Sequence, residues 1–229
     1  MTRHARPCEQ VFGDVLDPAS SSSVEGPTMI EVTERRCDSP FAHCMFSTVF
    51  SPEVAQGLSR YLTDWDDWSY RSEPRNRVRT CHWRPHDLPP AMAALLTGEV
   101  LAGLATRMQD VFGEVFDTDF FVTANKQVPG DGSMVHNDYF ADQLDHPFFF
   151  THRLIVYLSP DDVAGRGGVL GLFGSENPRE LLRVIAPRFN SGVAMAMGPR
   201  SFHAVSAITA GTRYSLCFSF TNVDHRYHP

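Results

Sequence analysis

The sequence predicts a mainly β protein, a barrel or jelly roll made of two sheets, with helices placed before the strands. Two observations support this fold class. Apolar residues recur at helical spacing between residues 52 and 112, whereas the chain after residue 120 breaks into short apolar runs. Glycine and proline separate these runs, as they do between the short strands of sandwiches and barrels.

The first forty residues differ from the rest of the chain. Residues 18–23 are rich in serine, Gly26-Pro27 follows them, and no apolar periodicity is sustained. We therefore expect residues 1–40 to be a flexible N-terminal segment. Residues 41–229 are long enough for one full-sized core and are expected to form a single domain, with helical support from about 52–112.

Two helices are expected in the supporting region. Ser51 is a good N-cap and is followed by proline at the first helical position, so the first helix should span residues 52–64. Its apolar residues recur at helical spacing: Val54, Leu58, Tyr61 and Leu62. A second helix is expected from Pro90 to Phe112, with Gly113 ending it.

The remainder of the chain is expected to be almost entirely strand. The strands that we expect are Phe120–Val128, Met134–Phe140, His146–Leu158, Gly168–Phe173, Arg183–Ile185, Gly192–Met197, His203–Ser206 and Arg213–Asn222.

One of these strands carries two side chains that can bind a metal, in the segment His136-Asn137-Asp138. Because side chains alternate along a strand, a His-x-Asp pair on a strand points both side chains toward one face. His203 and Arg213 follow on later strands that the fold can bring alongside. Two imidazoles and one carboxylate, with other positions open, are the ligand set of non-haem Fe(II) oxygenases. Taken singly, His203 also fits a satisfied histidine near a strand end, and Arg213 fits a surface cation.

From about Phe120 to Asn222 the sequence resembles the Fe(II)- and 2-oxoglutarate-dependent dioxygenases, in particular the branch that includes prolyl hydroxylases. Besides the His-x-Asp pair, the resemblance rests on four segments in the family's order. They are Tyr157-Leu158-Ser159 after an apolar strand, Gly167-Gly168 opening the next strand, Pro199–Val205 with the pattern Pro-x-x-x-His-x-Val, and Gly211-Thr212-Arg213. The resemblance implies a double-stranded β-helix with N-terminal helices.

The resemblance also implies the cofactors and their partners. Fe(II) would be held by His136, Asp138 and His203, and 2-oxoglutarate and O2 would take the remaining positions. Arg213 would bind the distal carboxylate of 2-oxoglutarate with its planar fork, with Ser215 as a second donor. Tyr157 either donates its phenol to 2-oxoglutarate or is a core tyrosine. Since Asp138 is present, hydroxylation is expected rather than halogenation, whereas desaturation, ring closure and epoxidation use the same ligand set and stay open. The iron would carry the reactivity.

Residues that could contact the substrate are less specific. Asn125 and Gln127 share one face of a strand and could touch substrate or co-substrate, or simply line the barrel mouth. Arg153 lies on a strand next to the metal site and could clamp an amino acid's carboxylate. Arg75, Arg77 and Arg79 alternate, so they form either an anion-binding face or a solvated one.

Composition limits the possible partners. The net charge is −7 and no basic block occurs, so nucleic acid is not expected as a partner. Five scattered cysteines without a Cys-x-x-Cys pair are typical of a reducing compartment, and no apolar run could span a membrane, so we expect a cytoplasmic protein. The absence of an evident peptide-binding module favours a small metabolite, an amino acid or derivative, as substrate. A peptidyl or prolyl hydroxylase and a non-catalytic cupin-like barrel stay open, as does the oligomeric state.

Overall fold

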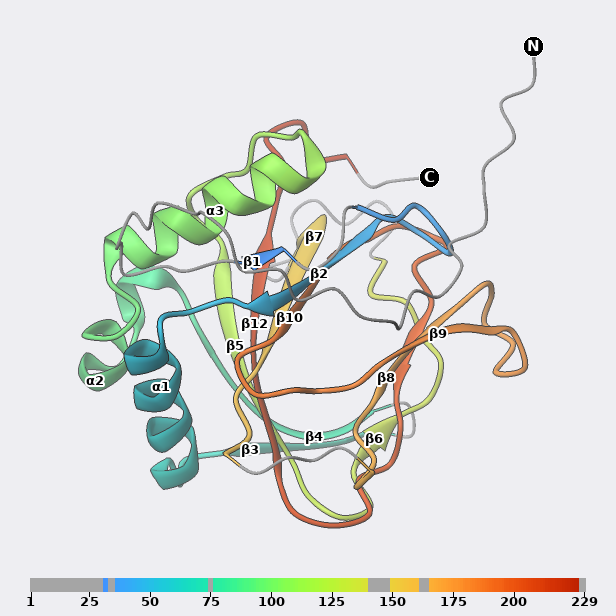
Figure 1. Cartoon of the computed structure of the whole chain (residues 1–229), viewed down its shortest axis with the longest axis horizontal. Coiled ribbons are helices and arrows are strands. Elements are labelled where there is room, and N and C mark those ends of the chain that lie inside the picture. The colour runs from blue at the N-terminus through green and yellow to red at the C-terminus, as the bar shows by residue number, and fades with distance from the viewer. Residues whose placement is uncertain (1–30, 33–35, 74–75, 140–148, 161–164, 227–229) are drawn as a thin grey trace, which may run out of the picture.

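The structure is a computed structural model, and it describes residues 31–32, 36–73, 76–139, 149–160 and 165–226 (Figure 1). Most of the N-terminal segment that we expected to be flexible lies outside these residues. None of the described helices combines the length and the apolar character needed to cross a membrane.

The described part of the chain is mainly β, as predicted, and its strands pair antiparallel in two sheets. The larger, nine-stranded sheet has the order β1-β2-β10-β7-β12-β5-β4-β3, with β6 on β4. Its strands are β1 (Glu31–Val32), β2 (His43–Thr48), β3 (Ser69–Glu73), β4 (Asn76–Trp83), β5 (Phe121–Gln127), β6 (Gly132–Ser133), β7 (His152–Tyr157), β10 (Gly192–Ala196) and β12 (Arg213–Phe220). The smaller sheet has the order β11-β8-β9, made of β8 (Leu170–Phe173), β9 (Leu181–Ile185) and β11 (His203–Val205). In Figure 1, β3 and β4 run across the direction of β5 and β12, so the larger sheet is strongly curled.

In the described part of the chain, three α-helices and one 3-10 turn precede the main run of strands. α1 (Pro52–Asp64) covers the expected range, and the Ser51 hydroxyl caps it by accepting a hydrogen bond from the backbone N–H of Val54. The single helix expected over 90–112 is wrong, because the chain forms α2 (Pro90–Ala93) and α3 (Gly98–Phe112). The break occurs because the Thr97 hydroxyl starts a new helix by capping Val100 N–H. A short 3-10 turn spans Pro85–Asp87.

The two faces of the curled sheet bury different sets of residues. On the outer face, α1 and α3 pack against alternate residues of the central strands, including Val156, Leu216 and Phe218. On the inner face, Ile155, Tyr157, Val193, Met195 and Cys217 pack with Leu170 and Leu172 of the smaller sheet. Since side chains alternate, the polar residues of β5, β7 and β12 that share the inner face lie between the two sheets. This is the space in which the candidate site forms.

Candidate metal centre

Three side chains that were singled out in the sequence meet at one end of the space between the sheets. One ligand atom each from His136, Asp138 and His203 lies within 4.8 Å of the others. The two histidines are held side by side by a backbone pair, with His136 N donating to His203 O at 3.0 Å and His203 N to His136 O at 2.8 Å. Their ring centroids are 4.5 Å apart.

The backbone also fixes which nitrogen of each imidazole faces the cluster. Nδ1 of His136 lies 2.8 Å from the carbonyl of Met134, and Nδ1 of His203 lies 2.9 Å from the carbonyl of Ser201. A carbonyl only accepts, so each Nδ1 carries the proton and each Nε2 presents its lone pair. The Nε2 atoms lie 3.8 Å and 3.6 Å from the Asp138 carboxylate. Both imidazoles are therefore in the tautomer that binds a metal.

The expected strand Met134–Phe140 is wrong, although the grouping that it was meant to explain is present. Among the described residues 134–139, only His136 pairs with another backbone segment, as an isolated bridge to His203. Side chains hold the rest: the amide of Asn137 donates to the Pro199 carbonyl at 3.0 Å, and His136 bonds to Met134. These side chain–backbone bonds, one local and one to a distant segment, replace the hydrogen bonds of a ladder. Phe140 lies outside the described residues.

The charge on Asp138 is compensated by Arg153 from β7. Nη1 of Arg153 lies 2.5 Å from Oδ2 of Asp138, and both side chains are about one-fifth exposed, at 20% and 21%. Burial alone would raise the pKa of Asp138, but Arg153 and the two histidines outweigh burial and hold it well below its usual range. Burial, together with the neighbouring His203, lowers the pKa of His136 to about 4. At neutral pH the cluster is therefore a carboxylate with a neutral His136.

We expect the stability of the metal-free protein to fall as the pH drops from 6.5 toward 4. Across this window the unfolded His136 binds a proton and the folded one resists it, so the unfolding free energy rises with pH. The expected contribution is roughly 1–2 kcal/mol, discounted for the partly exposed ring. Urea unfolding at several pH values, with His136→Asn alongside, measures it. Equal pH slopes for the two proteins would contradict the prediction.

A second group of polar residues surrounds Arg213 at the start of β12. Arg213 is only 3% exposed, and its Nη1 donates to Oε1 of Gln127 at 2.6 Å and, more weakly, to the Ser215 hydroxyl at 3.4 Å. Its guanidinium lies over the Tyr157 ring, 5.0 Å from the centroid. Among the described residues, neither Nε of Arg213 nor the Tyr157 hydroxyl has a hydrogen-bond partner. Burial raises the pKa of Tyr157, with Arg213 acting in the opposite direction, so the phenol stays a donor.

The Gly167-Gly168 pair makes room for this group. Both residues have positive φ, 81° and 71°. A Cβ on Gly168 would lie 2.6 Å from Cδ1 of Ile208 and 2.8 Å from Cδ of Arg213, and one on Gly167 would lie 2.0 Å from the carbonyl oxygen of Ala207. Any larger residue would displace the Arg213 side chain or the backbone opposite. The pair thus has a steric reason to be glycine.

Replacing Gly168 by alanine is therefore expected to disturb Arg213. The matched control is Gly165→Ala, because Gly165 has a similar φ of 82° and no atom of the described residues lies within 4 Å of its Cβ position. In both variants backbone strain should lower the free energy of unfolding by about 1–2 kcal/mol. Only Gly168→Ala should lower it by about 1 kcal/mol more, because of the close contact of the new Cβ. Thermal unfolding of both proteins gives the difference. Equal losses would show that Arg213 is not crowded there.

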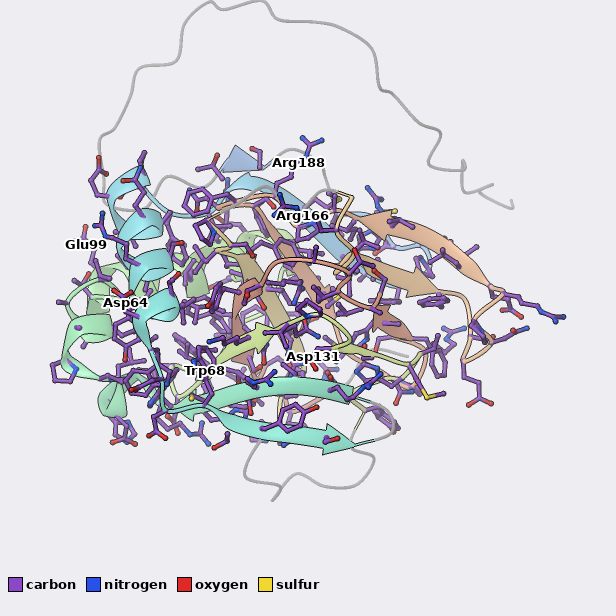
Figure 2. All side chains as sticks on the ribbon, turned by 90° about the horizontal axis from the view of Figure 1, so that it is seen from below. Asp64, Trp68, Glu99, Asp131, Arg166 and Arg188 are labelled. Carbon is purple, nitrogen blue, oxygen red and sulfur yellow. The ribbon has the colours of Figure 1, made fainter. Side chains whose placement is uncertain are left out.

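The structure places the remaining sequence candidates differently. The Asn125 amide donates to Sγ of Cys217 at 3.2 Å, on the wall between Arg213 and the metal cluster. Arg77 is exposed on β4, and Arg75 lies outside the described residues. Arg79, on β4, forms an ion pair with the buried Asp131 at 2.9 Å. Asp131 is labelled in Figure 2. Arg79 thus stabilises the turn between Val128 and Asp131.

Two residues near the cluster escaped the sequence analysis. Phe150 lies under the Arg153 guanidinium at 4.1 Å, and Cys217 lies on the inner face of β12. Cys217 could have been found, because it is four residues after Arg213 and shares its face by the strand period. Phe150 gave no such signal, since it stands just before β7 in a run of three phenylalanines.

Comparison with known proteins shows the fold but no close relative. No known family profile matches the chain, and no curated protein matches it. A prolyl-4-hydroxylase from Pseudomonas putida is similar with a TM-score of 0.63 and 16% identity, covering 78% of this chain and 91% of that one. A prolyl hydroxylase from Trichoplax adhaerens, solved with a peptide of hypoxia inducible factor, has a TM-score of 0.59 and 19% identity over 80% and 85% of the two chains.

A 2OG-Fe(II) oxygenase family protein from Burkholderia pseudomallei has a TM-score of 0.55 and 12% identity, covering 80% of this chain and 88% of that one. At these identities the similarity concerns the fold. The chain has the fold of the 2OG-Fe(II) oxygenases and is prolyl-hydroxylase-like in architecture.

Proposed function

We propose that the protein is an Fe(II)- and 2-oxoglutarate-dependent dioxygenase that hydroxylates a C–H bond of a prolyl residue in a polypeptide. One observation carries the proposal. The space between the two sheets contains both the cluster of His136, Asp138 and His203 and a buried Arg213 whose Nε has no partner among the described residues. In this proposal the two sheets are the walls of a double-stranded β-helix, and the helices support the outer face of the larger sheet.

The donor set fits Fe(II). Two Nε2 lone pairs and one carboxylate oxygen, grouped within 4.8 Å, leave open positions for other ligands. The carbonyls of Met134 and Ser201 orient the two rings. No cysteine belongs to this cluster, which argues against a structural zinc site.

The surroundings of Arg213 fit the distal carboxylate of 2-oxoglutarate. An unpaired Nε of a buried guanidinium and an unpaired buried phenol are costly unless an acceptor completes them. A carboxylate accepts from both, and Gln127 and Ser215 hold the guanidinium in place. In this arrangement Gln127 positions Arg213 rather than touching substrate, which narrows the role expected from the sequence.

Iron and 2-oxoglutarate together supply the oxidation of a C–H bond by O2, with release of succinate and CO2. The chain's own residues do the rest. The two histidines and Asp138 hold the metal, and Arg213 with Tyr157 orients the co-substrate. The apolar residues Ile155, Leu170 and Val193 exclude water from the space between the sheets.

The choice of a polypeptide substrate rests on similarity. The sequence alone favoured a small metabolite, but two of the similar structures are named as prolyl hydroxylases, one of them in complex with a peptide fragment. A free amino acid is the second candidate. The observation that favours it is Arg153, a cation at the metal cluster whose side chain is 20% exposed.

The test is an anaerobic visible spectrum of the metal-free protein, given Fe(II) and then 2-oxoglutarate. We expect a metal-to-ligand charge-transfer band that appears only when both are present, because 2-oxoglutarate must bind the metal through its keto acid group. No band at saturating 2-oxoglutarate would refute the proposal and favour a cupin-like site or a binding barrel without turnover.

A further inference from the structure

Arg153 is the one cation that contacts the candidate metal ligands among the described residues, and its orientation is fixed. Nε donates to the Ser219 hydroxyl at 3.3 Å, and Nη1 donates to Asp138 at 2.5 Å. Phe150, only 2% exposed, supports the guanidinium from below at 4.1 Å. The fork therefore has one fixed plane, and its remaining amino group, Nη2, has no hydrogen-bond partner among the described residues.

The space beside this guanidinium is aromatic on one side. Phe121 packs edge-on against Phe150, with their ring centroids 5.8 Å apart, and Arg84 lies over Phe121 at 5.5 Å. His82 lies on β4, which pairs with β5, the strand of Phe121. Burial, and after it the charges of Arg71 and Arg153, lower the pKa of His82, so this imidazole adds no charge at neutral pH. The described surroundings of Arg153 thus combine apolar rings with positive charge.

The charges explain why Arg153 does more than neutralise Asp138. Once Fe(II) is bound, the metal itself compensates the Asp138 carboxylate. Fe(II) then contributes two positive charges, and Arg153 and Arg213 contribute one each. Asp138 and 2-oxoglutarate together contribute three negative charges, so one positive charge is in excess. Arg213 is paired with the distal carboxylate, so the excess resides at Arg153. The Asp138 carboxylate is then shared between the metal and Arg153, so among the described residues one positive charge at this half-buried group is left uncompensated. Such a charge is unfavourable, and one further anion would remove the imbalance.

We propose that Arg153 is a specificity-determining residue that binds a carboxylate of the substrate through its free amino group. The proposal rests on the oxygenase function above and names its substrate class: a molecule with a carboxylate close to the oxidised carbon. An acidic side chain or C-terminus of a peptide and the carboxylate of a free amino acid offer the same chemistry. Arg153 links this carboxylate to the metal ligand Asp138, which places the adjacent carbon at the metal cluster.

The first experiment uses acetate as the smallest carboxylate. Carboxyl-labelled ¹³C-acetate is added anaerobically to protein loaded with Fe(II) and 2-oxoglutarate, and the nuclear relaxation of the label is compared with that in Zn(II)-loaded protein. We expect paramagnetic enhancement in the wild type, at least a fivefold loss of it in Arg153→Gln, and retention in Arg153→Lys. Arg179→Gln, an exposed arginine outside the site, controls for net charge.

Two results would overturn the assignment of Arg153. Enhancement of the same size in Arg153→Gln means that acetate binds the metal or another cation, and no enhancement in the wild type means that no carboxylate site exists. Both are read with the charge-transfer band intact in every variant. Absence of that band in the wild type instead contradicts the proposed function, so the two failures are distinct.

The second experiment identifies the source of the carboxylate by succinate release. One pair of probes is L-proline and L-prolinamide, and the other is the blocked peptide Ala-Pro-Glu and its Gln counterpart. We expect the charged member of one pair to react at least tenfold faster, and Arg153→Gln to remove that preference. Equal rates for charged and neutral members would refute the carboxylate requirement.

Discussion

Replacing Asp138 by alanine is expected to abolish 2-oxoglutarate-dependent hydroxylation and to weaken Fe(II) binding by about 100-fold or more. The reason is geometric: the carboxylate lies 3.8 Å and 3.6 Å from the two Nε2 atoms and, among the described residues, is the only acidic member of the cluster. Even partners that only support metal ligands are worth about 10- to 100-fold in affinity, so a direct ligand should cost at least as much. Equilibrium titration with Fe(II) under anaerobic conditions measures the first effect, and succinate release measures the second.

The control for this change is Asp131→Ala, which breaks another Arg–Asp pair of similar geometry. Arg79 lies 2.9 Å from Asp131, but this pair holds a turn rather than the metal cluster. Asp131→Ala should therefore cost stability while leaving Fe(II) affinity within about threefold of wild type. Full hydroxylation by Asp138→Ala without an added ligand would show that the iron site has been assigned wrongly.

The grouping of His136, Asp138 and His203 could be predicted from the sequence because the signals of these residues are local. His136 and Asp138 lie two apart beside turn residues, and His203 lies in a segment that the family resemblance singles out. The conformation of the first segment could not be predicted in the same way. Period-two spacing suggested a strand, but hydrogen bonds from Asn137 and to Met134 hold the segment instead, and these depend on where Pro199 lies in space.

The strands β2, β3 and β4 were not expected from the sequence, and for β4 the cause is similar. β4 carries Arg77 and Arg79 on either side of the buried Val78, so its composition resembles a solvated run. It becomes a strand because it pairs with β5 over five residues, a long-range contact that local propensity does not contain. The pairing of Arg153 with Asp138 likewise depends on how β7 is placed against the segment of His136, which explains why the sequence suggested a substrate clamp but not its link to a metal ligand.

The second large effect is expected at Arg213. Replacing it by alanine should raise the dissociation constant of 2-oxoglutarate by about 30-fold to a few thousandfold, the range of 2–5 kcal/mol for breaking a buried charge pair. Fe(II) affinity should change little, because Arg213 belongs to the group around Gln127 and Tyr157 rather than to the metal cluster. Titration of the charge-transfer band with 2-oxoglutarate gives the constant, and Arg213→Lys, which keeps the charge without the planar fork, should fall between wild type and Arg213→Ala.

An isosteric substitution of the residue that contacts Arg213 separates the effect of the Arg213 charge on 2-oxoglutarate binding from the effect of its shape. Gln127 is 3% exposed and accepts the shortest hydrogen bond that Arg213 makes, at 2.6 Å. Gln127→Glu keeps this contact but supplies a permanent counter-charge, which competes with the distal carboxylate of 2-oxoglutarate. We expect a loss of 2-oxoglutarate affinity of at least tenfold, whereas Gln127→Ala, which only loosens the guanidinium, should lose less. A buried guanidinium that glutamate already neutralises has little attraction left for a second carboxylate. An unchanged affinity of Gln127→Glu for 2-oxoglutarate would therefore mean that the charge of Arg213 does not bind the co-substrate.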